Sequence, residues 1–388
     1  MDKIKINKSA LYACSSKVYL AKILSNYKKG IVINQRELRR VKHFFDNEDK
    51  VFYKSKTTGE IFSNKPANYS PKKYRKFNDP SIKRKEVLRR LNFFLKQIET
   101  PKYLFSVKDK DYVKNAKIHR GNSHYIMLDI TSFFPNCDYR NIFEWLLSDS
   151  GLAMKPDIAT CICDLVTSPR NGQYRELPQG YPTSTLIAYF SYKKMFDEIA
   201  TLAKLRGLKF STYVDDLTFS YNDNIQLDNE FFILEIKQLV SKYGHSLNDK
   251  EKIYDCSKHY SSSYNPLITG VFVKRWKIRA SRKLHSKMIK KYNKLINLKI
   301  IDSTTYFEAW EMYQSLQGIC ISINTIEPQK TKKNRQHILN YIENNKKKFP
   351  FETNIKRIKE LRLEKKIYDA YRSGTLREFI SKHSNIIF

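Results

Sequence analysis

The segment FSTYVDDLTFS, residues 210–220, decides the fold, because two aspartates stand between two short runs that mix apolar and hydroxyl side chains. The pattern predicts a strand, a tight turn and a second strand, with Asp215 and Asp216 at the turn. Asp is common in turns for local backbone reasons, so the pair alone also fits a purely structural hairpin. Carboxylate oxygens are the ligands that Mg²⁺ prefers, so a third carboxylate nearby would favour a metal site.

A third acidic residue, Asp129, ends the apolar segment YIMLD, which is a candidate buried strand. A carboxylate at a buried strand end needs a partner, because an unpaired buried charge is costly. We therefore predict that Asp129, Asp215 and Asp216 converge on two Mg²⁺ ions about 4 Å apart, which suits in-line phosphoryl transfer. Asp129 and Asp215 are the expected principal ligands, with Asp216 in support, and Mn²⁺ is an alternative ion.

The composition indicates a polyanionic partner. The chain has 388 residues, with 72 Lys and Arg against 39 Asp and Glu, which gives a formal net charge of +33. Nucleic acid is the first expectation and an acidic membrane surface the second. The 26 Tyr and 23 Phe suit base stacking beside phosphate contacts, although most of them are expected in the core. The length allows two or three domains.

Cysteine usage and hydropathy suggest where the protein works. Its six cysteines form no CxxC pair, and the histidines do not fall at zinc spacing, so we expect a reducing compartment and no structural metal. No apolar run is long enough to span a bilayer, and residues 1–17 lack a secretory apolar region. The expectation is a soluble, cytosolic protein.

Coarse secondary structure follows from periodicity. Residues 1–100 are basic and mostly helical in pattern, with a turn-rich interruption over 56–81, after which Ser81 caps a helix. In that helix Arg84 and its basic neighbours lie mostly off the apolar stripe, on a face that is either solvated or phosphate-contacting. Residues 101–275 alternate strands and helices, including one long helix over 186–207, and therefore predict an α+β domain. Residues from about 280 onward are helical and very basic.

Four motifs follow one another along the chain: LDITSFF at 128–134, LPQGYPTS at 177–184, YVDDLTFS at 213–220 and ITGVFV at 268–273. Two further segments are NAKIH at 115–119 and LQGICISINTIEP at 316–328. The four motifs have the order and spacing of a reverse transcriptase palm, and with the two further segments the chain resembles the retron and bacterial defence-associated branch of that family. The resemblance covers roughly residues 85–330.

The resemblance implies a right-hand polymerase fold with fingers, an RRM-like antiparallel palm sheet and a helical thumb. We expect an N-terminal basic helical region with the start of the fingers over 1–100. The fingers and palm core follows over 101–275, then the thumb over 276–345 and a C-terminal helical extension over 346–388.

It also implies an RNA-directed DNA polymerase that joins deoxynucleoside triphosphates with two Mg²⁺ ions. A dedicated non-coding RNA would be template and partner, in antiphage defence, together with an effector protein or a second copy of the chain. Template-independent or protein-primed DNA synthesis is the first alternative, and a non-catalytic RNA-binding scaffold is the second.

Roles at the nucleotide are carried over from the family motifs. Phe134 takes the position of the steric gate against ribonucleotides, with Phe133 as its competitor and Ile130 beside them. Gln179 would lie against the incoming nucleotide, and Gly180 would allow close backbone approach. Further implied contacts are Tyr181, where retron-type relatives usually have a small residue, the general-acid position shared between Lys250 and Lys252, and triphosphate-clamping Lys108, Lys110 and Lys114.

Contacts to the nucleic acid are implied elsewhere in the chain. Thr269 and Gly270 belong to the expected primer grip, while Asn115 and His119 would fix the fingers near the template. A basic thumb helix should follow the duplex backbone without reading sequence and lose affinity steeply with salt. Its expected contact residues are Arg279, Arg282, Lys283, Lys287, Lys290, Lys291 and Lys294.

Overall fold

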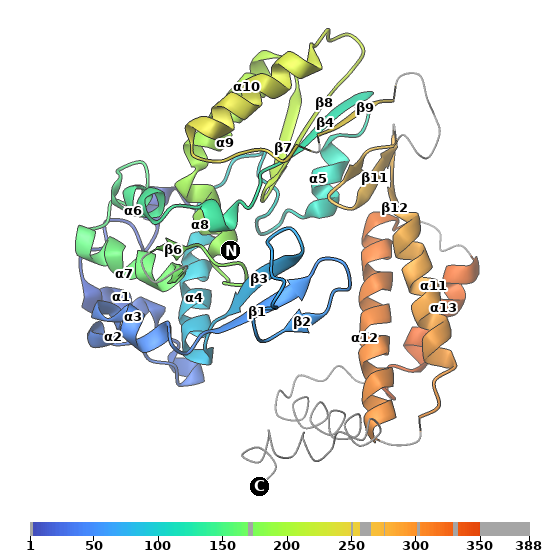
Figure 1. The fold of residues 1–388 in the computed structure, drawn as a ribbon, viewed down its shortest axis with the longest axis horizontal. Helices are drawn as coiled ribbons and strands as arrows, with labels where there is room; N and C mark the ends of the chain where they lie inside the picture. The colour runs from blue at the N-terminus through green and yellow to red at the C-terminus, as the bar shows by residue number, and fades with distance from the viewer. Residues whose placement is uncertain are drawn as a thin grey trace. The chain divides into compact units, whose positions relative to one another are not determined.

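The computed structural model describes residues 3–169, 174–249, 251–256, 265–274, 276–300, 303–328 and 333–349. The chain forms two compact units, of which the first ends at Thr269 and the second begins at Gly270. Both units are coloured along the chain in Figure 1. Helices and strands both occur in the first unit, and its sheets are antiparallel, which confirms the predicted α+β class.

A four-stranded antiparallel sheet is the centre of the first unit, with the strand order β7-β8-β4-β9. Helices α9 (Lys193–Leu205) and α10 (Asn229–Lys242) lie together beside this sheet (Figure 1), and the Phe219 ring of β8 meets Phe232 of α10 at 5.0 Å. Both strands of the predicted hairpin are confirmed. The strands are β4 (His124–Asp129), β7 (Lys209–Tyr213), β8 (Asp216–Tyr221) and β9 (Lys252–Asp255).

Two helices of the first unit begin at aspartate caps, and one predicted helix is divided in two. Asp138 caps α6 (Tyr139–Leu147), and Asp228 caps α10 (Asn229–Lys242). The single helix predicted over 186–207 is wrong, because α8 (Ser184–Ser191) and α9 (Lys193–Leu205) are separate. Between them the backbone of Tyr192 leaves helical geometry, while its hydroxyl accepts hydrogen bonds from Asp138 N at 3.0 Å and Asn141 Nδ2 at 2.8 Å.

A three-stranded antiparallel sheet occupies residues that were predicted to be helices and turns. It consists of β1 (Lys50–Ser55), β2 (Ile61–Phe62) and β3 (Tyr74–Asp79), in the order β2-β1-β3. Phe52 and Phe77 are cross-strand partners, and their rings stack at 5.5 Å. Such pairs stabilise a sheet, but they join residues far apart in sequence, which local periodicity does not reveal.

The other helices of the first unit build its core. Ser81 caps α4 (Ile82–Leu95) as predicted, and the apolar stripe of this helix is buried. Arg84 is buried as well, which corrects the prediction that it lies on a solvated or phosphate-contacting face. The remaining elements are α1 (Lys17–Leu24), α2 (Gln35–Arg39), α3 (Val41–Phe45), α5 (Tyr112–Ile118), α7 (Pro156–Val166), β5 (Ser168–Pro169), β6 (Arg175–Glu176) and β10 (Leu267–Ile268).

The second unit combines a hairpin with helices. Strands β11 (Val271–Lys274) and β12 (Lys277–Ala280) pair antiparallel, and Ser281 then caps the basic helix α11 (Arg282–Ile296). Helix α11 packs on α12 (Ser303–Ile326), and α13 (Lys333–Asn344) follows. Arg279 lies on β12, so its predicted place in the basic helix is wrong. Among the residues that the structure describes, no helix is long and apolar enough to cross a membrane.

Candidate active site

The aspartate turn has an unusual backbone. Tyr213 pairs with Asp216, so Val214 and Asp215 alone connect β7 to β8. Val214 has φ 63°, in the left-handed region that a β-branched side chain rarely adopts. Such a conformation costs about 1–3 kcal/mol and persists only where surrounding structure holds it. The Asp215 carbonyl accepts a hydrogen bond from Ile130 N at 3.1 Å, which ties the turn to the end of β4.

Asp129 lies next to this turn. It is the cross-strand partner of Asp216, and directly opposite residues of an antiparallel pair project their side chains to one face. The backbone carbonyl of Asp129 accepts a hydrogen bond from Asn248 N at 2.8 Å, and its Oδ2 lies 3.4 Å from Asn248 Nδ2. The sheet thus brings the three predicted acidic residues to one of its ends.

Burial and neighbouring negative charge disfavour the ionisation of Asp215 and Asp216. Burial raises the pKa of Asp215, and the charge of Asp129 adds to the rise, while Arg75 opposes it. Asp216 retains solvent access, yet the protein around its carboxyl group and the charges of Asp215 and Asp129 raise its pKa to about 6. Lys252 on β9 opposes that rise. A bound cation would relieve this repulsion.

The donor set here consists of carboxylates without Cys or His, which suits a hard divalent cation. Across the described part of the chain, however, no group of three or more His, Cys, Asp and Glu side chains is arranged to hold a metal ion. The three aspartates are therefore neighbours in the sheet but do not form a complete set of metal ligands.

Phe133 and Phe134 have different environments. Phe133 is buried, and its ring packs against Tyr192, Phe196 and His245 at 6.1, 5.9 and 5.1 Å. Phe134 is only half-buried. The structure thus places Phe133 in the core and leaves Phe134 accessible. The neighbouring Ile130 is buried, so a nucleotide contact there would involve its backbone and not its side chain.

The loop Leu177–Gly180 lies against β3. The carbonyl of Gln179 accepts a hydrogen bond from Asn78 N at 2.8 Å, and the Gln179 side chain remains half-buried. Gly180 has φ 114°, and a Cβ there would lie 2.3 Å from the Asn78 carbonyl oxygen. Close backbone approach at Gly180 is therefore observed, and its partner is the strand β3.

Tyr181 has a different setting from the predicted contact with nucleotide. Its side chain is 5% exposed and lies in the protein interior, where its hydroxyl donates a hydrogen bond to Asp49. Burial raises the pKa of this hydroxyl far above its usual range. The Tyr181 side chain thus points into the protein interior, where its hydroxyl binds the Asp49 carboxylate and its ring packs against the guanidinium group of Arg84.

Two of the cations predicted to clamp the triphosphate serve the protein's own structure instead. The Lys110 ammonium donates to the carbonyls of Pro101 and Leu104 at 2.8 and 2.9 Å, and Lys114 donates to that of Asp109 at 2.6 Å. Lys108 is exposed, and its charge acts on Lys3. Of the two general-acid candidates, Lys250 lies outside the described residues, whereas Lys252 is exposed on β9.

Asn115 and His119 are both fully buried, so the prediction that they contact nucleic acid is wrong. His119 Nδ1 and Nε2 lie 2.7 Å from Ser220 Oγ and 2.8 Å from Ser211 Oγ, which links β8 to β7. Burial lowers the pKa of His119 to about 3, so the ring is neutral at physiological pH. These residues support the sheet beneath the site.

Of the predicted cationic contacts of the second unit, Lys291 is half-buried and the others are exposed, as is required for such a role. Helix α11 carries most of them, and Arg279 on β12 lies 3.9 Å from Glu327. In the predicted primer grip, Thr269 and Gly270 both have positive φ, 46° and 86°, and Thr269 Oγ1 donates to the Tyr112 carbonyl at 2.9 Å. The exposed cations among the predicted contacts are Arg279, Arg282, Lys283, Lys287, Lys290 and Lys294.

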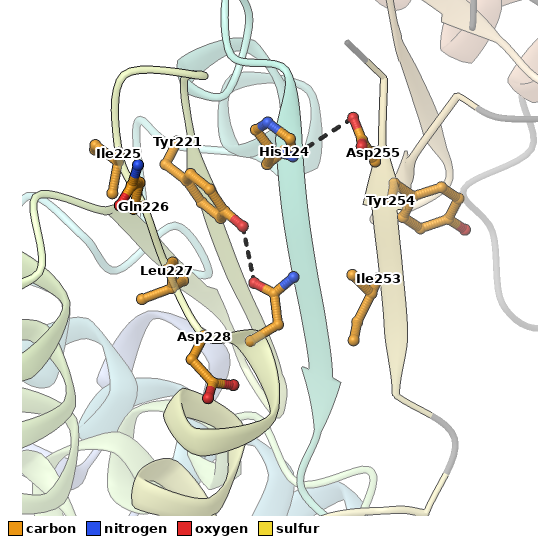
Figure 2. A pocket seen from close by; sticks show the side chains of 10 residues that line it. His124, Tyr221, Ile225, Gln226, Leu227, Asp228, Ile253, Tyr254 and Asp255 are labelled. Atoms are coloured by element: carbon orange, nitrogen blue, oxygen red, sulfur yellow. Dashed lines mark hydrogen bonds and ion pairs between the residues drawn. The ribbon is translucent and has the colours of Figure 1, made fainter. Parts of the chain in front are cut away.

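A pocket of about 490 Å³ lies at the opposite end of β4 from Asp129 (Figure 2). Its wall includes His124, whose Nε2 lies 2.7 Å from Asp223 and whose Nδ1 lies 3.6 Å from Asp255. The His124 ring stacks on Tyr221 at 4.8 Å. The strand β4 separates this pocket from the aspartate end of the sheet.

The chain belongs to the reverse transcriptase (RNA-dependent DNA polymerase) family, whose model matches residues 63–264. It is 28% identical to the retron Se72 reverse transcriptase of Salmonella heidelberg (strain 579083-10) over 209 residues, 52% of each chain. It is 32% identical to the retron Mx162 reverse transcriptase of Myxococcus xanthus over 128 residues, 30% of this chain and 26% of the relative. The retron Ec83 reverse transcriptase of Escherichia coli is 30% identical over 125 residues, 30% of this chain and 38% of the relative.

These matches confirm the resemblance to retron-type reverse transcriptases. The chain matches about half the length of the Salmonella relative and less of the other two.

Proposed function

We propose that this protein is an RNA-directed DNA polymerase that extends a primer with deoxynucleoside triphosphates. The observation that carries the proposal is the convergence of Asp129, Asp215 and Asp216 at one end of an antiparallel sheet in a chain of the reverse transcriptase family. Burial and the charge of Asp129 raise the pKa of both Asp215 and Asp216, and a bound divalent cation would favour the charged forms of these carboxyl groups.

The aspartates would hold divalent cations, Mg²⁺ or Mn²⁺. Two such ions, when bound, would stabilise the attacking 3′-oxygen and the leaving pyrophosphate oxygen of an in-line displacement. The chain's own task is to position these carboxylates. Pairing of β4 with β8 fixes Asp129 opposite Asp216, and the Ile130–Asp215 hydrogen bond fixes the turn.

Positive charge for the triphosphate comes from two strands. Arg75 on β3 acts electrostatically on Asp215, and Lys252 on β9 acts on Asp216. We assign Arg75 to the phosphates, because Lys110 and Lys114 are occupied by backbone carbonyls. Lys252 takes the general-acid position for the departing pyrophosphate. Catalysis in phosphoryl transfer is mainly positioning and charge stabilisation.

Selection of the nucleotide rests on Gln179 and Phe134. The Phe134 ring is accessible where Phe133 is not, so Phe134 would collide with a ribose 2′-hydroxyl. Gln179, held by its backbone on β3, would lie against the incoming nucleotide. We assign the Thr269–Gly270 turn to the primer end and the exposed cations of α11 to the duplex backbone.

The proposed biological setting follows the resemblance to the retron and defence-associated branch, and the relatives are retron reverse transcriptases by name. A dedicated non-coding RNA would serve as template, with its DNA product as second partner, in antiphage defence. An effector protein or a second copy of the chain would complete the system.

Sequencing tests this function directly. The protein would be purified from its host and its co-purifying RNA and DNA sequenced, with primer extension on the RNA recovered. DNA complementary to the bound RNA supports the proposal. A homopolymer made without RNA would instead indicate template-independent synthesis, and DNA joined to a protein hydroxyl would indicate protein priming. RNA binding without any nucleotide incorporation would leave only the scaffold alternative.

A further inference from the structure

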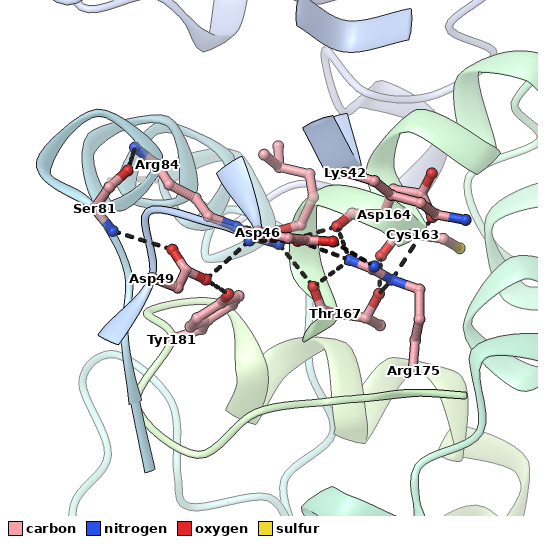
Figure 3. Close-up of polar contacts among 11 residues, drawn as sticks. Lys42, Asp46, Asp49, Ser81, Arg84, Cys163, Asp164, Thr167, Arg175 and Tyr181 are labelled. Atoms are coloured by element: carbon pink, nitrogen blue, oxygen red, sulfur yellow. Dashed lines mark hydrogen bonds and ion pairs between the residues drawn. The ribbon is translucent and has the colours of Figure 1, made fainter. Parts of the chain in front are cut away.

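A buried polar network surrounds Tyr181, the residue that directly follows the loop Leu177–Gly180 (Figure 3). The Tyr181 hydroxyl donates to Asp49 Oδ2, and its ring centre lies 4.8 Å from the guanidinium carbon of Arg84. Asp49 Oδ1 accepts a hydrogen bond from Ser81 N at 3.1 Å. The carboxylate that receives Tyr181 is thus itself fixed at the start of α4.

Arg84 is the centre of this network. Its Nη1 lies 2.9 Å from both Asp46 Oδ1 and Asp49 Oδ2, so the buried positive charge meets two carboxylates. A guanidinium group has five N–H donors in a planar fork, and with its donors engaged it has little freedom to move. Its Nε and Nη2 donate to the backbone carbonyls of Asp164, Leu165 and Thr167 on and after α7.

The same network also holds the other side of the loop. Arg175 lies on β6, two residues before the loop begins, and its Nη1 donates to Asp46 Oδ2 at 2.7 Å. Its Nε donates to Thr167 Oγ1 at 2.8 Å. The network therefore binds the chain on both sides of the loop Leu177–Gly180, at Arg175 before it and at Tyr181 after it.

Between these two attachments the loop meets β3. Asn78 N donates to the Gln179 carbonyl at 2.8 Å, and Gly180 packs directly on the Asn78 backbone. Strand β3 also carries Arg75, whose charge acts on Asp215. The loop that the network holds at both ends thus contacts, through Gln179 and Gly180, the strand that carries Arg75.

We propose that Tyr181 is a positioning residue for the incoming nucleotide: bound to Asp49 beneath Arg84, it holds the loop Leu177–Gly180 in register with β3, so that Gln179 and Arg75 are set for the same substrate. The inference rests on the proposed polymerase function. It extends that function to a residue that touches no substrate.

A purely stabilising role would not require this chemistry. Buried charges lose their hydration, and well-packed apolar side chains often stabilise such a site as well or better. Hydrogen bonds to charged groups are directional, however, and they fix orientation as apolar contacts do not. The polar network is therefore suited to fixing the orientation of the loop.

The test uses Tyr181→Phe in the full chain, which keeps the ring over Arg84 and removes only the hydroxyl. Tyr125→Phe is the matched control, because Tyr125 is 1% exposed and its hydroxyl donates to the Asn122 carbonyl at 2.7 Å, away from the loop. Two quantities are measured for each variant. One is KM and kcat for a deoxynucleoside triphosphate on an RNA template with a DNA primer, and the other is hydrogen exchange of the Asn78 amide.

Tyr181→Phe is expected to raise KM about fivefold, with kcat changed by less than about twofold, and to speed exchange at Asn78, whereas Tyr125→Phe does neither. An unchanged KM in Tyr181→Phe, or a rise matched by the control, would overturn the inference, as would unchanged exchange at Asn78. Absence of incorporation by the unaltered chain would instead refute the proposed function. Normal incorporation with an unmoved KM refutes only the role of Tyr181.

Discussion

Asp129 on β4 and Asp216 on β8 are cross-strand partners at the end of the central sheet. The turn residue Asp215 is attached to the same place through its carbonyl, which Ile130 N reaches at 3.1 Å. The carboxylates are thus placed by backbone pairing and not by side-chain packing. Exchanging their side chains for isosteric amides should therefore leave the sheet intact, which makes the site open to a clean test.

The double substitution Asp215→Asn with Asp216→Asn removes two negative charges from the turn. We expect nucleotide incorporation to fall by about 10³-fold or more, because the cation-binding charge is removed. RNA affinity should change by less than about twofold, since phosphate contacts dominate it. Single-nucleotide incorporation and filter binding measure the two quantities. Incorporation at the wild-type level would refute the assignment of the metal site.

Phe134→Ala should admit ribonucleotides, because the accessible ring is the proposed barrier to a 2′-hydroxyl group. Discrimination, taken as the ratio of kcat/KM for deoxy- and ribonucleotides, is expected to fall about tenfold or more. Phe133→Ala is the contrasting variant, since loss of this buried ring should lower the free energy of unfolding by about 3–5 kcal/mol. If discrimination stays constant in Phe134→Ala, another residue is the gate.

Arg84→Met should be severely destabilising, because it leaves Asp46 and Asp49 buried without their shared cation. Breaking such a site from one side costs about 3–5 kcal/mol of unfolding free energy. Arg89→Met on the same helix is the control, since the Arg89 side chain is 53% exposed and its partner Glu86 keeps Lys29 at 2.9 Å as a second cation. Urea denaturation of both variants compares them, and equal losses would contradict the assigned importance of Arg84.

Two buried histidines should make the protein acid-sensitive. Burial lowers the pKa of His119 to about 3 and that of His245 to about 4, so the unfolded chain binds more protons than the folded chain between those values and about 6.5. The free energy of unfolding should therefore decrease as pH falls from 7 to 5. His245→Leu should reduce this decrease by up to about 2 kcal/mol. Denaturation at both pH values checks the prediction, which an equal decrease in the variant would contradict.

Salt dependence should report the duplex contacts of α11. Lys287→Ala with Lys290→Ala is expected to lower the slope of log affinity against log salt by about one unit for each phosphate that is no longer neutralised. The affinity should weaken similarly for unrelated sequences, because phosphate contacts carry no sequence information. Lys193→Ala is the control, since Lys193 is paired with Asp197 on α9. An unaltered slope in the double variant would exclude these two lysines from the interface.

Local sequence signals predicted the parts of the site that local chemistry determines. The β7–β8 hairpin, the strand ending in Asp129 and the cap at Ser81 all follow from residues within a few positions of one another. Their turn and capping chemistry leaves a short-range pattern in the sequence.

The buried contacts that the sequence did not predict depend on partners that lie far away in the chain. The burial of Arg84 requires Asp46, Asp49 and the end of α7, which lie 35 to 83 residues from it in sequence. The same holds for Tyr181, whose partner Asp49 is 132 residues away. No local sequence pattern shows that a basic or aromatic residue has such a distant partner. Arg84 was therefore predicted to lie on a solvated or phosphate-contacting face, and Tyr181 was predicted to contact the nucleotide.

Gly180 is a position at which a very small substitution would displace the loop Leu177–Gly180 from β3. Its missing side chain leaves room for only a hydrogen atom against Asn78, so one added carbon would push the loop from the strand by steric force alone. Gly180→Ala would thus shift the loop without deleting any acidic, basic or aromatic group. In the proposed polymerase, such a variant would separate nucleotide positioning from RNA binding and could serve as bait for the proposed RNA partner.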